Sequence, residues 1–541
     1  MRSLLPGADD YRLVRTTWRG DVVAGITVGI VALPLALAFG VSSGAGAAAG
    51  LITAIVAGLV AAVFGGSNVQ VSGPTGAMVV VLAPIVAAHG AGAVAVVAVM
   101  AGVLVVAAGA ARLGRVVGVI PWPVIEGFTV GIGVIIFLQQ VPAALGVTAS
   151  GHGLNALVAA VEAVAAARWP LALVPLGAVV LVAAIMIALA RLSPRIPASF
   201  LAIAVVTLAA ALAGLPLATI GELPRSLPSP MLPALDPGVL AALAGPAVAV
   251  AALAAIESLL SARVADSISD TGPYKPDREL VGQGLASIAA GLFGGMPATG
   301  AIARTAVNVK AGARTRVAAI THSIALLGVV YLAATVVALI PLAALSGVLM
   351  VTAVRMVSVR SVSQVLRSTR SDAVVFALTA VVTLSFDLVV AVCLGVIAAA
   401  FFALRAVSAG AGVHREELPG RAVTGDARIA LFRIDGALFF GAADRVTERV
   451  AGHAGIDVVI LRLSQVQMLD ATGAHTLGEL VALLERRGIT VLIKGIRPEH
   501  ARLLTGVGAT RALRHPNHVF TDLDAAVGHA RSHIARTIAT T

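Results

Sequence analysis

The chain has little charge and a single cysteine, and both shortages limit what it can be. Charged residues make up 12% of its 541 residues, whereas 59% are hydrophobic and the mean hydropathy is +0.99. Ordinary soluble domains carry about 25% charged residues, so this composition indicates a protein embedded in a membrane. Cys393 lies inside an apolar run, which excludes a disulfide within the chain and indicates no thiolate metal site.

Several functional motifs are also missing from the sequence. It has no Walker loop, which argues against ATP-driven chemistry by this chain alone, and no nucleophile elbow or other catalytic signature. The histidines are scattered without metal-ligand spacing. The charged N-terminal residues do not form a removable signal peptide. We therefore expect neither an enzyme nor a cofactor, and no bound metal unless Na⁺ serves as a coupling ion.

Long apolar runs dominate the first 404 residues. Runs such as "AVAVVAVMAGVLVVAAGA" are apolar on every face, which favours membrane-spanning helices and excludes the alternating pattern of a barrel. Two pieces, 75–88 and 298–309, are too short for ordinary crossings and bring the total to fourteen segments. The twelve longer runs are 22–42, 47–64, 93–111, 120–139, 171–190, 197–215, 238–262, 279–294, 315–337, 338–354, 371–386 and 387–404.

The basic residues test this segment count. If all fourteen segments cross, the clusters of Lys and Arg fall on one side of the membrane, as the positive-inside rule requires. Both termini are then cytoplasmic, and the net charge of +11 needs no nucleic-acid partner. The clusters are Arg2, Arg12, Arg15 and Arg19; Arg112 and Arg115; Arg191 and Arg195; Arg263, Lys275 and Arg278; Lys310, Arg314 and Arg316; and Arg355, Arg360, Arg367 and Arg370.

Two similar phrases interrupt the apolar sequence at matching places. "FGGSNVQVSGPTGA" begins at Phe64 and "FGGMPATGAIART" at Phe293, an offset of about 229 residues. The first phrase precedes the third segment and the second precedes the tenth, which indicates a repeat of seven segments. Because seven is odd, the two copies must have opposite orientations across the membrane. The sequence therefore predicts seven-plus-seven inverted repeats.

The Gly and Pro residues of these phrases predict half-helices instead of full spans. A half-helix exposes unpaired N–H groups and the positive end of its dipole, which favour an anion. Thr75 and Thr299 add hydroxyl groups at the two breaks. The alternative is a simple Gly-Pro loop with close helix packing. The recurrence of the break favours a binding site.

Glu257 is a carboxylate inside an apolar segment, with Ser261 one helical turn later. An intramembrane carboxylate is costly, so we interpret Glu257 as a coupling residue that holds a proton or, with Ser261 and Thr299, a Na⁺ ion. The alternative is a structural carboxyl group between helices. Arg304 either attracts anions or pairs and snorkels at the cytoplasmic end of its segment.

After Arg405 the composition becomes polar. We divide the chain into a cytoplasmic N-terminal segment (1–20), a transmembrane domain (21–406), a linker (407–425) and a small α/β domain (426–541). In this last domain we expect two short strands around Asp435-Gly436 and a helix over 442–454. A strand over 457–466, a helix over 471–488, a strand over 489–496 and a helix over 498–508 should follow.

The membrane part resembles the SulP family of anion transporters. The resemblance is carried by "DVVAGITVGIVALPLALAFG", "GGSNVQVSGPTGA", "PWPVIEGFTVGIGVIIFLQQ" and, most specifically, "IESLLSARVADSISDTGPYKPDRELVGQGLASIAAGLFGGMPATGAIARTAVNVKAGARTR". It implies a core and a gate domain, elevator-like alternating access and a homodimer. The anion-binding positions it implies are Gly73, Pro74, Thr75, Gly76, Ala298, Thr299, Gly300 and Ala301.

The resemblance also bears on substrate and coupling. Glu257 falls on the family's acidic position in the eighth span, where a sodium-coupled bicarbonate member has Asp followed by Thr. Proton-coupled dicarboxylate members have Glu, so H⁺ is favoured over Na⁺. We expect symport of sulfate or bicarbonate, with dicarboxylates next, across the inner (plasma) membrane. The alternatives are an anion exchanger or channel, and an anion sensor without coupled accumulation.

The C-terminal domain resembles the STAS domain of sulfate transporters and anti-sigma factor antagonists. The matching stretch is "LRLSQVQMLDATGAHTL". Thr472 falls where the antagonists carry a phosphorylatable Ser, which implies regulation by phosphorylation or by a cytosolic protein partner. The plain alternative is a first-turn helix residue beside Asp470, the expected N-cap.

Overall fold

The computed structural model describes residues 4–115, 120–147, 155–193, 196–233, 236–385, 388–409, 412–438 and 455–540. The chain forms two compact units, Met1–Val396 and Ile397–Thr541. The first unit is helical, and the second contains a five-stranded sheet. This agrees with the expected combination of a polytopic helical domain and a small α/β domain.

All fourteen expected segments are helices in the part of the chain that the structure describes. Nine helical stretches there are long and apolar enough to cross a membrane. Shorter additional helices are η2 (Ala8–Tyr11), α6 (Val141–Ala144), α7 (Ala156–Ala166) and α15 (Val359–Arg367). The fourteen are α1 (Val14–Ser42), α2 (Ala47–Phe64), α3 (Gly76–His89), α4 (Gly92–Ala110), α5 (Trp122–Gln139), α8 (Leu173–Leu192), α9 (Ala198–Leu212), α10 (Pro237–Ile268), α11 (Pro276–Leu292), α12 (Ile302–Lys310), α13 (Val317–Ala338), α14 (Leu342–Met356), α16 (Arg370–Ser385) and α17 (Leu388–Ala409).

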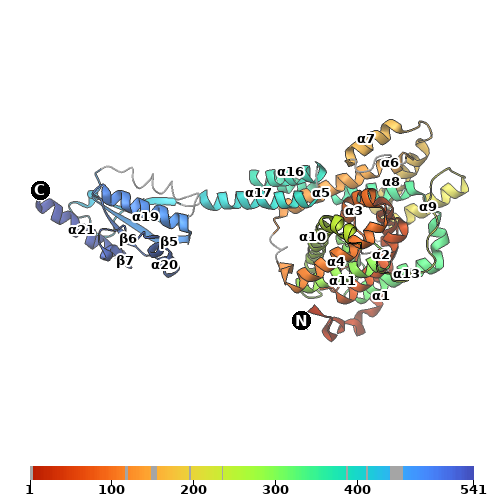
Figure 1. Ribbon diagram of the computed structural model, residues 1–541, viewed down its shortest axis with the longest axis horizontal. Helices are drawn as coiled ribbons and strands as arrows, with labels where there is room; N and C mark the ends of the chain where they lie inside the picture. Colours follow the sequence, from red (N-terminus) through yellow and green to blue (C-terminus); the bar gives the residue numbers. More distant parts are fainter. Residues whose placement is uncertain are drawn as a thin grey trace. The chain divides into compact units, whose positions relative to one another are not determined.

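These helices pack in two groups that draw equally on both halves of the sequence. In one group, α4 packs on α10 and α11, α1 packs on α13, and α2 packs on both α11 and α13 (Figure 1). In the other, α5 packs on α14 and α16, and α8 packs on α9 and α14. The first group thus contains segments one to four and eight to eleven, so each half of the sequence contributes four segments, in keeping with inverted repeats. We call the first group the core and the second the gate, after the two domains that the family resemblance implies.

Small residues allow the core helices to approach closely. Gly102 of α4 and Gly284 of α11 face each other, and a Cβ on either would come within 2.7 or 2.6 Å of the other's carbonyl oxygen. Without a hydrophobic driving force between helices in lipid, such close backbone contact is a main source of helix association. The glycines of these segments therefore support helix packing in addition to breaking helices.

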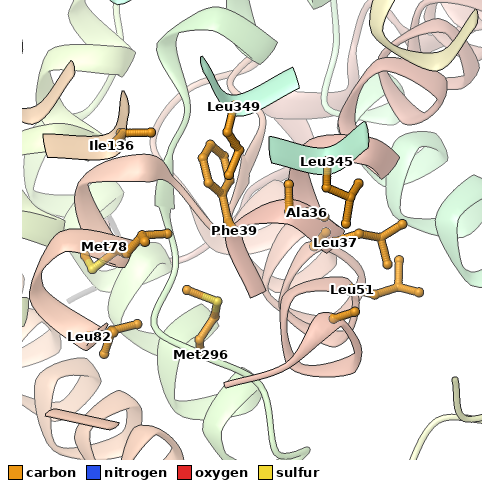
Figure 2. Close-up of a cluster of buried hydrophobic side chains, with 14 of the residues drawn as sticks. Ala36, Leu37, Phe39, Leu51, Met78, Leu82, Ile136, Met296, Leu345 and Leu349 are labelled. Carbon is orange, nitrogen blue, oxygen red and sulfur yellow. The ribbon is translucent and has the colours of Figure 1, made fainter. Parts of the chain in front are cut away.

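A buried apolar cluster joins the two helix groups. Figure 2 shows Phe39 of α1 beside Leu349 of α14, with Leu345 on the same helix nearby. Met78 of α3 and Met296 belong to the same cluster. Met is flexible enough to fill irregular space at such a contact. The cluster lies next to the two sequence phrases, so it positions them between the groups.

The second unit is a sheet covered by helices on both faces. The strands are β3 (Gly412–Glu416), β4 (Ile429–Leu438), β5 (Val458–Leu469), β6 (Thr490–Lys494) and β7 (Val519–Phe520), hydrogen-bonded in that order. The β3–β4 pair is antiparallel and the other pairs are parallel. α21 (Leu523–Thr540) packs on one face, while α19 (Ala471–Arg486) and α20 (Pro498–Val507) share the other apolar cluster.

The structure corrects two expectations for this unit and leaves a third untested. The stretch around Asp435-Gly436 is the single strand β4, whose pairing with β5 shifts register on either side of these two residues. Gly436 has φ +79°, a conformation that allows such an irregularity without breaking the strand. The expected linker 407–425 contains β3, and α17 extends into it. The helix expected over 442–454 lies outside the described residues.

Candidate functional site

The two interrupted phrases meet in the core group. β1 (Ser72–Gly73) and β2 (Thr299–Gly300) pair antiparallel, with Ser72 opposite Gly300 and Gly73 opposite Thr299. α3 begins at Gly76 and α12 at Ile302, so both half-helices start beside this short pairing. The predicted breaks are therefore brought together, and two helix N-termini, each a favourable position for negative charge, point to one region.

Side-chain hydroxyls satisfy much of the irregular backbone. The N–H of Gly300 donates to Ser258 Oγ at 3.1 Å, and that of Ala298 donates to Ser287 Oγ at 3.2 Å. The N–H of Ala301 donates to the carbonyl of Val71 at 2.9 Å. These predicted anion-binding positions thus direct their N–H groups to protein acceptors. The N–H groups that can bind an anion here are those of the first turns of α3 and α12, because these groups have no acceptor within their own helix.

Glu257 lies between the two predicted threonines. Its Oε2 accepts hydrogen bonds from Thr75 Oγ1 at 2.8 Å and from Thr299 Oγ1 at 2.9 Å, and the two hydroxyl oxygens are 3.3 Å apart. Thr75 and Thr299 are buried, whereas Glu257 is partly exposed. The structure thus brings together one residue from each repeat and the intramembrane carboxylate.

Ser261 has a different neighbour from the one expected. Its hydroxyl oxygen lies 3.4 Å from Thr305 Oγ1, and Thr305 Oγ1 accepts from the N–H of Val71 at 3.1 Å. Ser261 is also fully buried behind Gly300, where a Cβ would come within 3.2 Å of the Ser261 Cβ. The Ser261 hydroxyl is therefore linked through Thr305 to the backbone of the first break at Val71.

Arg304 is buried beneath the junction. Its side chain is 2% exposed, and Nη2 donates to the carbonyl of Pro74 at 2.6 Å. A Cβ on Gly73 would come within 2.7 Å of Nη1, which has no hydrogen-bond partner among the described residues. Of the two interpretations left open by the sequence, snorkelling to the surface is excluded. A buried guanidinium carries positive charge beside the two half-helix termini.

Gly76 lies where the site meets the other helix group. It is the first residue of α3, and a Cβ there would collide with the side chain of Ile136 on α5. The ring of Phe39 lies 3.4 Å from the same position. A larger residue at position 76 would push the Ile136 side chain aside, so the start of the first half-helix lies directly against the gate group.

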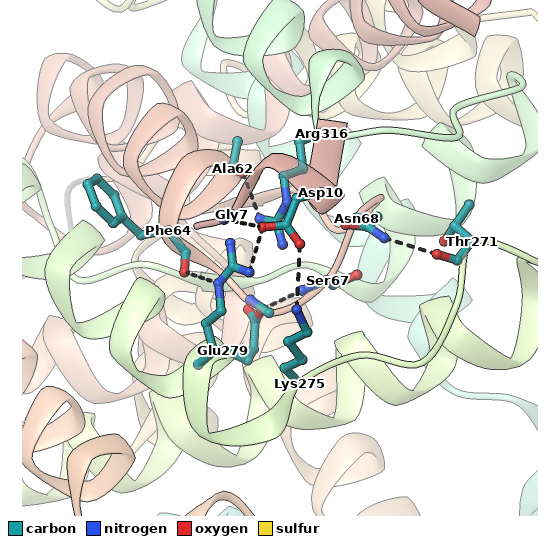
Figure 3. Close-up of polar contacts among 12 residues, drawn as sticks. Gly7, Asp10, Ala62, Phe64, Ser67, Asn68, Thr271, Lys275, Glu279 and Arg316 are labelled. Atoms are coloured by element: carbon teal, nitrogen blue, oxygen red, sulfur yellow. Dashed lines mark hydrogen bonds and ion pairs between the residues drawn. The ribbon is translucent and has the colours of Figure 1, made fainter. Parts of the chain in front are cut away.

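Glu279 is a buried carboxylate that was not predicted from the sequence as a site residue. Its Oε2 accepts from the N–H of Gly66 at 2.6 Å and from that of Ser67 at 3.1 Å, and Gln283 donates to Oε1 at 2.8 Å. Gln283 also donates to Ser72 Oγ at 2.6 Å, which links this carboxylate to β1. Figure 3 shows Glu279 beside Ser67 in this network. An acidic residue at the start of an apolar span, which leads into the second Gly-Gly turn, was the available signal.

Two buried arginines hold the C-terminal end of α2. Arg278 Nε donates to the carbonyl of Phe64 at 3.2 Å and Arg316 Nη1 to that of Ala62 at 3.0 Å (Figure 3). Asp10 of the N-terminal segment pairs with Arg278 at 2.7 Å. The pKa of the Asp10 carboxyl is lowered: burial opposes this shift, and hydrogen bonds from Gly7 and Arg278 outweigh it. The "FGG" turn is therefore fixed by charge-assisted contacts.

Thr472 is exposed in the first turn of α19 in the second unit. Asp470 is the N-cap, as expected, because its Oδ1 accepts from the N–H of Gly473 at 2.7 Å. The Thr472 hydroxyl is thus accessible, and a phosphate there would meet the positive end of the α19 dipole.

Comparison with known proteins gives the same two-part division. The profile of the sulfate permease family matches residues 18–379, and that of the STAS domain matches residues 421–526. The first match covers the helices of both groups up to α16, and the second covers the sheet from β4 to β7.

Curated relatives match almost end to end. The chain is 34% identical over 499 residues to the putative sulfate transporter YvdB of Bacillus subtilis, covering 90% of this chain and 93% of the relative. It is 30% identical over 533 residues to the bicarbonate transporter BicA of Synechocystis, covering 92% of each. The structure of the murine Slc26a9 anion transporter shares the fold, with a TM-score of 0.81, 16% identity and coverage of 95% and 91%. The chain therefore belongs to the sulfate permease family and is a multi-pass membrane protein with a C-terminal STAS domain.

Proposed function

We propose that the chain is a secondary active transporter of small anions, with sulfate or bicarbonate as the leading substrates and dicarboxylates next. One observation carries the proposal: Thr75 and Thr299, from opposite repeats, converge on Glu257 between two half-helix N-termini. The names of the sulfate and bicarbonate transporters among its relatives support the same class of substrate. The family is one of transporters, in keeping with the expectation that the chain is not an enzyme.

The geometry gives a physical reason for coupling. Both threonine hydroxyls donate to Glu257, so an anion that enters beside them meets a carboxylate and finds these donors occupied. Like charges in a low-dielectric region repel strongly. A proton or cation on Glu257 removes that repulsion and allows the hydroxyls to turn to the anion. Binding of the anion then requires the coupling ion.

We propose H⁺ as that ion, ahead of Na⁺. Glu257, Thr75 and Thr299 provide three oxygen-bearing side chains, but the hydroxyl of Ser261 is directed to Thr305. A bare cation needs several oxygen ligands, and because the Ser261 hydroxyl contacts Thr305, fewer oxygens are available to bind the cation. A proton needs only the carboxylate. Buried Arg304 then supplies constant positive charge for the anion in either state.

The two helix groups support an elevator-like movement of core against gate. The contact around Phe39, Leu345 and Leu349 is apolar, so sliding there breaks few hydrogen bonds; a described exception is the bond between Ser42 and Gln140 at 3.0 Å. We further propose a homodimer in the plasma membrane, which is the inner membrane in a cell with two. Both termini are cytoplasmic, and the STAS domain contacts a cytosolic protein.

Uptake into proteoliposomes tests the function. Sulfate, bicarbonate, succinate and chloride are supplied with an imposed pH or Na⁺ gradient. We expect sulfate or bicarbonate to accumulate when the outside is acidic. Exchange without accumulation would identify an exchanger or channel instead, and binding without uptake would identify a sensor.

Glu257→Gln tests the coupling step. The amide keeps the size of the side chain but does not titrate, so we expect gradient-driven accumulation to be lost while anion exchange persists. Glu126→Gln is the matched control, because Glu126 on α5 is bonded to Trp122 instead of a threonine of the site. Uptake in the Glu257→Gln variant that responds to pH or Na⁺ as in the unmodified protein would contradict the role of Glu257.

A further inference from the structure

Three histidines of the second unit lie together in the structure, and none of them belongs to the candidate anion site. His518 precedes β7 in the short helix η5 (Pro516–His518), and His529 and His533 are one turn apart on α21. One ring nitrogen from each lies within 4.8 Å of the others. The three histidines show no metal-ligand spacing in the sequence, because only two of them are near each other along the chain.

The distances fit a shared ligand. The Nε2 atoms of His529 and His533 are 3.2 Å apart. Two nitrogens bound to one tetrahedral Zn²⁺ at 2.0–2.1 Å are separated by about 3.3 Å, so the separation of this pair already fits such a site. The ring centroid of His518 lies 5.4 Å from that of His529 and 5.6 Å from that of His533. To complete a three-nitrogen site, the ring nitrogen of His518, now within 4.8 Å of the other two, must come to the same separation of about 3.3 Å.

His518 supplies the second observation. Its side chain is only 4% exposed, and its Nδ1 has no hydrogen-bond partner among the described residues. A buried polar atom without a partner costs free energy, and such an atom in a native structure calls for a ligand, a water or an ion. A metal ion held by the three rings provides that partner.

The electrostatic surroundings favour neutral rings. Burial, with the neighbouring Arg536, lowers the pKa of His533 to about 4, and burial also lowers the pKa of His518. Neutral imidazole is the form that binds metals. Arg514 and Arg536 oppose a cation, although Arg514 is paired with Glu485 at 3.1 Å. We therefore expect a site of moderate affinity.

We propose that His518, His529 and His533 form a binding site for Zn²⁺ or a neighbouring divalent transition metal in the STAS domain. Imidazole ligands suit these ions, and three protein ligands leave a coordination position for water. Ala526, Val527, Ala530 and Ile534 of α21 pack on the sheet, so a metal on the adjacent positions fastens this helix to the turn before β7. The site would make docking of the C-terminal helix dependent on metal.

The test uses the full chain in detergent, purified without a polyhistidine tag and stripped with a chelator. Titration with ZnCl₂ should show one equivalent bound per chain and a rise in the thermal midpoint of the STAS domain, because the metal binds the folded state. Loss of a direct ligand should weaken binding roughly tenfold or more in His529→Gln and in His533→Gln. His475→Gln, exposed on α19, is the matched control and should bind like the unmodified chain.

Co²⁺ provides a reading that does not depend on a variant. A four-coordinate site gives Co²⁺ an intense visible absorption that the hexaaqua ion lacks, and Zn²⁺ should displace it. The proposal is overturned if Co²⁺ added to the unmodified chain shows only the weak spectrum of the aqueous ion. It is also overturned if the double variant His529→Gln/His533→Gln binds Zn²⁺ as tightly as the His475→Gln control. The 3.2 Å contact would then be an ordinary hydrogen bond between two neutral rings.

Discussion

Individual side chains hold the backbone of the two helix breaks in place at the candidate site. Arg304 donates to the carbonyl of Pro74, and Ser258 and Ser287 accept from the backbone N–H groups of the second break. The sequence predicted Thr75, Thr299 and Glu257 as site residues, because hydroxyls at helix breaks and a carboxylate in a span are chemically conspicuous. The roles of Ser261 and Arg304 could not be read in this way, since each depends on which neighbour the side chain faces.

Arg304→Gln tests the buried charge. We expect a marked loss of anion uptake and weaker anion binding, because the amide removes positive charge from beside the two half-helix termini. Arg314→Gln is the control, since Arg314 is 55% exposed and pairs at the surface with Asp270. The measurements are uptake and the thermal midpoint of each variant in detergent. Normal anion affinity in a folded Arg304→Gln protein would assign Arg304 a purely structural role.

Elements associate through positions that admit no side chain. Gly284→Ala places a methyl group against the backbone of α4 and should destabilise the protein by about 1–3 kcal/mol, which is typical of overpacking. Gly245→Ala on α10 is the comparison, because a Cβ there meets nothing within 4 Å. It should be neutral or stabilising, as Ala favours a helix. Equal thermal midpoints for the two variants would contradict the close contact of α4 and α11.

The docking of α21 depends on an ion pair as well as on its apolar face. Arg531 donates to both carboxylate oxygens of Asp426, at 2.9 and 2.8 Å, and this contact lowers the pKa of Asp426. A carboxyl whose pKa is lowered by folding stabilises the folded state above its ordinary value of 3.8, and that contribution disappears as the pH falls through the lowered value.

Asp426→Asn should therefore speed hydrogen exchange in α21 at neutral pH. The pair is partly exposed, so the effect is modest. Below pH 3.8 the difference from the unmodified chain should shrink and vanish as the carboxyl protonates. Asp524→Asn, exposed in the first turn of the same helix, is the control. A difference that persists unchanged in acid would show that the charge of Asp426 is not what holds the helix.

At the scale of the whole molecule, the position of β3 changes where the chain can be divided. Ending the chain after Leu418 leaves β3 without β4, its hydrogen-bonded partner. An unpaired strand edge promotes aggregation. A chain that ends after Ala409 instead lacks β3 together with the rest of the sheet.

We expect the chain ended at Ala409 to remain monodisperse and to bind the transported anion, with impaired assembly or regulation. The chain ended at Leu418 should aggregate more. Size-exclusion chromatography with light scattering and anion-binding measurements on both chains check this. If the monodisperse shorter chain lost its affinity for the anion, the STAS domain would have to take part in binding.

The sequence by itself determined the features that depend on local chemistry. Low charge and long apolar runs required membrane helices, Gly and Pro placed two breaks at matching segments, and the alternation of strands and helices after residue 426 indicated an α/β domain. Only the tertiary structure decided which side chains meet. Residues 72–73 pair with 299–300, Glu257 reaches both threonines, and His518 joins His529 and His533. The strand pairing joins the two repeats, the Glu257 contacts join separate helices, and the histidine cluster joins a turn to a helix. All three depend on how packing orients each element, and no local sequence pattern specifies that orientation.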